Sequence, residues 1–138
     1  MRILTARQTD APAVEALLRS SPGVWQSSWR DDCVLRAISA SDGLAYIADE
    51  DGLLIGFACA HDAGFRAYLS EVVVAQSHQR QGVGSALMAA VERAVAERGC
   101  TLVVADVFPP AVPFYRRLRW REPRATLLCR DVGVDNAA

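Results

Sequence analysis

The length, composition and charge of the chain fit one globular domain and exclude several classes of protein. The chain has 138 residues, of which 51% are hydrophobic, enough to bury a substantial core. Its 15 basic and 16 acidic residues nearly cancel, so no overall positive field favours nucleic acid or an anionic membrane. No apolar run approaches the roughly 20 residues that cross a bilayer, and the N-terminus turns polar too early for a signal peptide. We therefore expect a single cytoplasmic domain over residues 1–138 with no nucleic-acid or membrane partner.

The first half of the chain predicts an alternation of helices and strands. Apolar residues recur at helical spacing after Asp10, and Ser21-Pro22-Gly23 ends that helix. Glu50-Asp51-Gly52 is typical of a hairpin turn between two strand-like runs. In chain order we expect a strand at residues 2–6, a helix after Asp10, a helix beginning at residues 28–32, and strands at residues 43–49, 53–61 and 67–75.

The second half predicts one long helix between two strands. Val83, Leu87, Val91 and Val95 recur every four residues on one face, and Gly99 provides a stop. A strand, a long helix and a further strand form a βαβ unit, whose two strands are parallel. In chain order we expect a helix over residues 82–98, a buried strand at 101–107, a short helix at 114–119 and a closing strand at 126–132.

A glycine-rich turn opens the long helix. It consists of Gln79, Arg80, Gln81, Gly82, Val83 and Gly84, followed by Ser85. The first amides of a helix have no intrahelical partner, and glycines let a diphosphate reach them. No lysine follows and residue 87 is leucine, so neither G-x-x-x-x-G-K-[ST] nor G-x-G-x-x-G matches. The glycines alone fit either an anion site or a tight turn for helix packing.

Two segments together resemble the GNAT superfamily of N-acyltransferases. Val72-Val73-Val74 and the turn up to Leu87 resemble the central strand and the [RQ]-x-x-G-x-[GA] loop of that family. Ala111-x-x-Phe114-Tyr115-Arg116-x-Leu118 resembles its A-x-x-[FL]-Y-x-x-L helix. The resemblance extends over essentially the whole chain in the order of its elements. It implies an α/β fold with a mixed sheet of about six to seven strands, a splayed central parallel pair, and about four flanking helices.

The resemblance implies that acetyl-CoA is the co-substrate, and it assigns the coenzyme site. The pyrophosphate would lie on the turn, that is on Gln79, Arg80, Gln81, Gly82, Val83, Gly84 and Ser85. The pantetheine arm would enter the splayed pair and bind the main chain of Val72, Val73 and Val74, and Tyr115 would also contact the coenzyme. Three valines also fit a buried strand, and both roles are compatible because the arm would use only main chain. The resemblance further implies a homodimer.

Acyl transfer to an amine requires groups that move protons, and the sequence offers three candidates. An ammonium with a pKa of about 10.4 must lose a proton, and the departing thiolate must gain one. Tyr115 matches the general-acid tyrosine of the family, although it would also serve as a packing aromatic. Glu71 is the only carboxylate on the presumed central strand and is the first candidate for the base; Asp106 is the second. Either carboxylate could act through water.

The acceptor site is expected in the early, variable region of the chain. Trp25 and Trp29 stand four residues apart and could wall a cation-binding cleft, with Asp31, Asp32 and Glu71 attracting an amine. The same tryptophans would also suit a hydrophobic core. No basic cluster is evident there, so the pattern favours a small cationic amine over an acidic acceptor.

The cysteines and histidines do not predict a metal site. The four cysteines are widely spaced without a C-x-x-C pair, and the chain has two histidines. We expect no metal, and we expect reduced cysteines that behave as small core residues. These are Cys33, Cys59, Cys100 and Cys129.

The leading hypothesis is an N-acetyltransferase that moves an acetyl group from acetyl-CoA to a primary amine, on a small molecule or a peptide, by direct attack. Two departures from the family pattern support an alternative. Phe108 stands where many members have asparagine, and Leu118-Arg119-Trp120 replaces L-G-[FY], so the helix lacks its glycine stop. The alternative is a non-catalytic CoA-sensing or partner-binding module with the same fold.

Overall fold

The structure is a computed structural model, and it describes residues 1–133. The chain divides into two compact units, Met1–Ala105 and Asp106–Ala138. The expectation of a single domain over residues 1–138 stays a prediction, and its residues 134–138 lie outside the described residues. Within residues 1–133, no helix combines the length and the apolar character needed to cross a bilayer.

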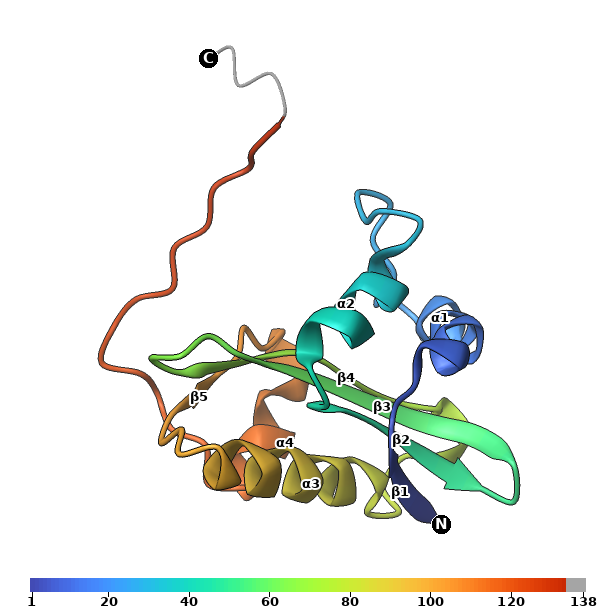
Figure 1. Ribbon diagram of the computed structural model, residues 1–138. Helices are drawn as coiled ribbons and strands as arrows, with labels where there is room; N and C mark the ends of the chain where they lie inside the picture. The colour runs from blue at the N-terminus through green and yellow to red at the C-terminus, as the bar shows by residue number, and fades with distance from the viewer. Residues whose placement is uncertain (134–138) are drawn as a thin grey trace. The chain divides into compact units, whose positions relative to one another are not determined.

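The first unit is built on a five-stranded mixed sheet in the order β1-β2-β3-β4-β5 (Figure 1). Its first four strands are antiparallel neighbours, and β5 runs parallel to β4. Asp51 and Gly52 both have positive φ, 51° and 86°, which confirms the predicted hairpin turn between β2 and β3. The strands are β1 Arg2–Thr5, β2 Ala45–Glu50, β3 Leu53–Asp62, β4 Ala67–Val74 and β5 Val103–Val104.

The expected number of strands is wrong, because the described residues form five strands rather than six to seven. Residues 126–132 form no strand, and Leu127 and Leu128 are exposed. Of the strand predicted at residues 101–107, only Val103–Val104 is a strand in the structure. A strand exists only where a neighbour supplies a hydrogen-bonded ladder, and apolar residues alone do not provide one. The α/β class and the four helices are as expected.

Helices cover both faces of this sheet (Figure 1). Helices α1, Ala11–Ser20, and α2, Cys33–Ser41, lie on one face, and α3, Val83–Glu97, lies on the other. The core under α1 and α2 is a single cluster of apolar side chains. Each valine, leucine, isoleucine or phenylalanine in it stabilises the fold by about 1.5–3 kcal/mol when fully buried. It contains Val14, Leu17, Leu18, Val34, Ile38, Ala45, Ile47, Phe57, Cys59 and Val73.

Gly56 on β3 lets α3 approach the sheet closely. A Cβ atom added at this glycine would lie 2.9 Å from Leu87 Cδ1 and 3.1 Å from Val83 Cγ1, closer than carbon atoms pack. Both contacted residues belong to the apolar face of α3 that the sequence predicts. The first turn of α3 is therefore pressed against the sheet, next to the 3-10 turn η2, Gln76–His78, that follows β4.

The second unit contains the 3-10 turn η3, Pro109–Ala111, and the helix α4, Val112–Arg117. A proline near the start of α4 is compatible with a helix, because the first N–H groups need no intrahelical partner. Where the family has glycine, Arg119 adopts φ = 66°, and its N–H bonds the Arg116 carbonyl at 2.9 Å. The helix thus ends in the left-handed conformation that a glycine would adopt without strain.

Replacing Arg119 by glycine is expected to raise the free energy of unfolding by roughly 0.5–1 kcal/mol, because glycine adopts positive φ without a Cβ clash. Urea unfolding of the wild type and of Arg119→Gly measures the difference. The matched control is Arg117→Gly at the last residue of α4, where the backbone is helical, so the same free energy is expected to fall by up to about 1 kcal/mol. Destabilisation by both substitutions would contradict this account of how α4 ends.

Candidate active site

The turn between β4 and α3 has the geometry expected of an anion site. Gly82, the N-cap of α3, has φ = 82°, a conformation that glycine adopts without strain. The Gly82 carbonyl accepts the first helical hydrogen bond, from Ala86 N–H at 3.0 Å. Within residues 1–133, no side chain caps this end of the helix. The amides of Val83, Gly84 and Ser85 precede that first bond, so they are placed to bind an anion or water.

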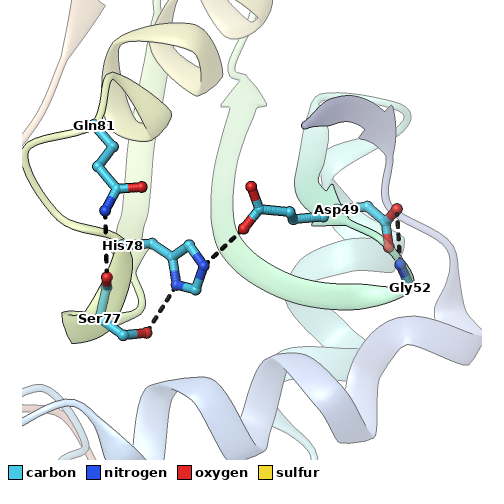
Figure 2. Close-up of polar contacts among 6 residues, drawn as sticks. Asp49, Gly52, Ser77, His78 and Gln81 are labelled. Carbon is cyan, nitrogen blue, oxygen red and sulfur yellow. Dashed lines mark hydrogen bonds and ion pairs between the residues drawn. The ribbon is translucent and has the colours of Figure 1, made fainter.

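Side chains of η2 and of the turn itself hold this segment in place beside the sheet. His78 Nε2 lies 2.7 Å from a carboxylate oxygen of Glu50 on β2, and His78 Nδ1 lies 2.8 Å from Ser77 Oγ. Gln81 donates to the Ser77 carbonyl at 3.4 Å, and Gln79 donates to the Val74 carbonyl at 3.2 Å. Figure 2 draws the contacts of Ser77, His78 and Gln81 as dashed lines. The backbone of residues 76–82 is therefore fixed from β2 and from the end of β4.

One edge of β4 is open next to this turn. β4 pairs with β5 only through Ala67 with Val103 and Tyr68 with Val104, although β4 continues to Val74. The main chain from residue 69 to 74 therefore has β3 on one side and, within the described strands, no partner on the other. Val72, Val73 and Val74, predicted to bind the pantetheine arm, lie in this unpaired stretch. Main-chain groups of this kind can accept an extended ligand as an added strand.

A bulge in β4 turns two consecutive side chains toward the same face. Cys59 of β3 pairs with Glu71 and Ala60 pairs with Leu69, so Ser70 is an extra residue without a partner of its own. In a regular strand, neighbouring side chains point to opposite faces. Here Ser70 and Glu71 line one cavity together. The sequence alone predicted Glu71 but missed Ser70.

The cavity lies between this face of the sheet and the two N-terminal helices. It has a volume of about 590 Å³, enough for a small molecule or an amino-acid side chain. The sheet contributes Phe57, His61, Ser70 and Glu71, and α1 and α2 with the segment between them contribute Leu18, Trp29, Arg30, Cys33, Val34, Arg36, Ala37, Ser39 and Ala40. Arg30 and Arg36 therefore line the cavity, whereas the sequence had suggested no basic cluster at the acceptor site.

The residues predicted for the acceptor site separate into two groups. Trp29 and Glu71 line the cavity, while Trp25, Asp31 and Asp32 do not belong to its lining. Trp25 packs edge-to-face on Trp29, with ring centroids 5.2 Å apart, and stacks under the Arg19 guanidinium at 3.9 Å. Asp32 binds Arg36 Nε at 2.7 Å, and this hydrogen bond lowers the pKa of the Asp32 carboxyl.

Three polar side chains form a cluster on the sheet side of the cavity. His61 Nε2 lies 3.1 Å from Ser70 Oγ and 3.6 Å from Cys59 Sγ. Ser70 Oγ donates to the Cys59 carbonyl at 3.2 Å, and Cys59 Sγ donates to the Ala37 carbonyl at 3.6 Å. His61 had no role predicted from the sequence. The alternation of Phe57, Cys59 and His61 could have indicated it, because residues two apart in a strand share a face.

The Cys59 thiol is kept neutral by its surroundings. Burial raises the pKa of Cys59 to about 11, against the ordinary value of 9.0, although a hydrogen bond with Ser70 opposes the shift. A neutral thiol is a weak nucleophile, so this residue is unsuited to carry an acyl group. The cysteines are free, as expected, but only Cys59 is fully buried; Cys33 and Cys100 are partly exposed and Cys129 is exposed.

The raised pKa predicts a loss of stability at high pH. The folded protein holds the Cys59 proton more tightly than the unfolded chain, so this stabilising contribution is complete below pH 9 and disappears as the pH rises toward 11. Between about pH 8 and about pH 11, the free energy of unfolding of the wild type should fall by about 2 kcal/mol more than that of Cys59→Ala. Urea unfolding at both pH values measures it, and parallel losses in the two proteins would refute the assignment.

The second unit carries the other two predicted catalytic residues. Tyr115 lies on α4, half-buried, with its ring edge-to-face against Phe114 and Trp120 at centroid distances of 5.2 and 5.1 Å. Asp106 is the first residue of the unit and is exposed. Phe108 has an exposed fraction of 69%. The catalytic roles of Tyr115 and Asp106 stay predictions.

No group of three or more histidine, cysteine, aspartate and glutamate side chains in residues 1–133 is placed to hold a metal ion.

The sequence profile described as "Acetyltransferase (GNAT) family" matches residues 11–119. The match covers most of the chain, so the protein belongs to the GNAT acetyltransferase family, and the resemblance stated from its motifs is confirmed. The match includes β4, the glycine turn, α3 and α4.

Solved structures with the same fold agree with this assignment. A transcriptional regulator from Bacillus halodurans C-125 superposes with a TM-score of 0.75 at 18% identity, over 94% of this chain and 99% of that one. The aminoglycoside N-acetyltransferase AAC(6')-Iy in complex with CoA gives 0.74 at 24%, over 95% and 94% of the two chains. The ribosomal-protein-S18-alanine N-acetyltransferase from Escherichia coli gives 0.69 at 22%, over 85% and 75%. At these identities the likeness establishes the fold.

Proposed function

We propose that this protein transfers an acetyl group from acetyl-CoA to a primary amine by direct attack. The observation that carries the proposal is the continuity of β4. This strand contributes Ser70 and Glu71 to the cavity and then runs with one open edge to the turn that opens α3. A thioester arm laid along that edge, with its pyrophosphate on the turn, would present its acetyl group near an amine held in the cavity.

Each part of the site has a proposed task. The turn from Gln79 to Ser85 binds the pyrophosphate, and the main chain of residues 72–74 binds the pantetheine arm. Glu71 attracts the acceptor ammonium, Trp29 walls the cavity, and Tyr115 protonates the departing thiolate. The sequence predicts Glu71 as the first and Asp106 as the second candidate for the base, each able to act through water. The neighbour AAC(6')-Iy is in complex with the bisubstrate analog CoA-S-monomethyl-acetylneamine, which supports a route that binds both substrates together.

Binding and turnover test the proposal separately. CoA at about 100 times its dissociation constant is expected to stabilise the folded protein by about 2.7 kcal/mol, seen as a rise of several degrees in the unfolding midpoint. Acetyl-CoA should then be consumed with at least one amine from a panel of polyamines, aminoglycosides, amino-acid derivatives and peptides. Stabilisation by CoA without turnover of any amine would favour the non-catalytic CoA-sensing module. No stabilisation would overturn the coenzyme site.

The family resemblance also leads us to propose a homodimer. Light scattering would then give twice the chain mass of 15.0 kDa. A mass equal to that of one chain would exclude the dimer.

A further inference from the structure

Two hydrogen-bond donors beside His61 are already committed to main-chain carbonyls. The single hydroxyl proton of Ser70 goes to the Cys59 carbonyl at 3.2 Å. The single thiol proton of Cys59 goes to the Ala37 carbonyl at 3.6 Å. Ser70 Oγ and Cys59 Sγ can therefore act only as acceptors toward the ring nitrogen that both of them approach.

This arrangement selects one tautomer of His61. Its Nε2 lies 3.1 Å from Ser70 Oγ and 3.6 Å from Cys59 Sγ. With the Ser70 and Cys59 protons directed at the two carbonyls, Nε2 is the nitrogen that carries a hydrogen. In a neutral imidazole the other nitrogen then has the free lone pair. Within residues 1–133, no hydrogen bond or ion pair engages His61 Nδ1. The ring borders the cavity next to Ser70 and Glu71.

We propose that His61 is the general base of the reaction and that its Nδ1 takes the proton from the acceptor ammonium, while Ser70 holds the ring through Nε2. This role rests on the proposed acetyl transfer. Ser70 is a positioning residue, since it acts through the imidazole. It can do so because the bulge in β4 turns it to the same face as Glu71.

The proton balance of this route is complete. The ammonium gives one proton to His61 Nδ1, and the amine lone pair then forms the C–N bond to the thioester carbonyl. When the C–S bond breaks, its electron pair leaves on sulfur. The nitrogen then loses a second proton, and the thiolate gains one proton. The imidazolium later releases its proton to water. The sum is an amide, a thiol and one proton, with no oxidant or reductant.

Imidazole suits this task better than the carboxylates do. A base is most effective when its ordinary pKa lies close to the working pH, and imidazole has a pKa of about 6.5 against about 4.3 for a glutamate. In this scheme Glu71 attracts the ammonium by its charge. Cys59 contacts the ring, and Tyr68 is the cross-strand partner of His61. The other titratable or charged groups that line the same cavity are Glu71 on β4, Cys33 and Arg36 on α2, and Arg30 before α2.

Nitrogen NMR of the histidine side chains tests the tautomer without any turnover. His61 is expected to show a protonated Nε2 and an unprotonated Nδ1 above the pH at which the ring becomes neutral. The chain has two histidines, so His78→Gln assigns the signals. Ser70→Ala should shift the His61 signals toward a mixture of tautomers. A wild-type His61 protonated on Nδ1 would overturn the proposal.

Kinetics test the role in the reaction. In the wild type, a plot of kcat/KM for the amine against pH should have a rising part, called the limb below, that reports loss of a proton from the imidazole. His61→Gln should lower kcat/KM at least about 10-fold, remove that limb, and leave the affinity for CoA unchanged. Ser70→Ala should shift this part of the pH profile to a different pH. A limb that persists in His61→Gln would overturn His61 alone, whereas a wild type without turnover would overturn the acetyl transfer on which its role rests.

Discussion

Replacing Gly82 by valine is expected to lower the affinity for CoA at least about 100-fold. Gly82 has φ = 82° and opens α3, so a valine there would strain the turn and place a branched side chain over the first amides of the helix. Two charge-assisted hydrogen bonds to a pyrophosphate contribute about 3 kcal/mol or more, which corresponds to this factor. Isothermal calorimetry with CoA measures it. Gly84→Val, at the second residue of α3, should act in the same direction.

Gly99→Val is the matched control for Gly82→Val. Gly99 follows the other end of α3, has the same φ of 82°, and, like Gly82, has open space around the position of a Cβ atom. Both substitutions therefore impose a similar backbone strain and should lower the unfolding midpoint by similar amounts. Only Gly82→Val should lose its affinity for CoA. Equal affinities of the two variants for CoA would refute the pyrophosphate site.

Replacing Tyr115 by phenylalanine is expected to lower kcat by about 100- to 1,000-fold, with the affinity for CoA unchanged. A phenol has an ordinary pKa of about 10, so it stays protonated at neutral pH and can give its proton to a thiolate. The ring itself is held by Phe114 and Trp120, and a phenylalanine keeps both edge-to-face contacts. The loss should therefore come from the hydroxyl alone.

The control for Tyr115→Phe is Tyr46→Phe, which removes the hydroxyl of a half-buried tyrosine on β2. Its kcat is expected to equal that of the wild type. Steady-state rates at saturating acetyl-CoA and amine compare the three proteins. A Tyr115→Phe variant as fast as Tyr46→Phe would show that Tyr115 serves only as a packing aromatic.

Elements with local determinants could be predicted from the sequence. The hairpin between β2 and β3 follows from Asp51 and Gly52, which adopt the positive φ values that this turn needs. The long helix α3 is bounded by Gly82 and Gly99, both at φ = 82°, and its apolar positions face the sheet. In each case neighbouring residues determine the conformation, so a short stretch of sequence carries the information.

Elements that depend on distant partners could not be predicted. Residues 101–107 and 126–132 have the composition of strands, but only Val103–Val104 finds a ladder, on β4. A strand and an exposed apolar segment have the same local pattern, and only the position of the neighbouring strand distinguishes them. Three prolines, at residues 109, 110 and 113, also remove donors that a longer sheet edge would need.

The same limit applies to the site. Glu71 was predicted from its place before the three valines, and it lines the cavity. Ser70 was missed because regular alternation directs it away from Glu71, and the bulge that reverses this arises from pairing with β3. Asp32 was predicted to attract an amine, but Arg36, four residues later, already binds it at 2.7 Å. That spacing was visible in the sequence as a helical ion pair.

The extra residue in β4 has an evolutionary consequence. Because Leu69 and Glu71 pair with the adjacent residues Ala60 and Cys59, Ser70 can be lost or gained as a single codon while every cross-strand partner is kept. Elsewhere in a strand, an insertion or deletion of one codon turns all the following side chains over. A lineage can therefore add or delete a functional group facing the cavity without rebuilding the sheet beneath it.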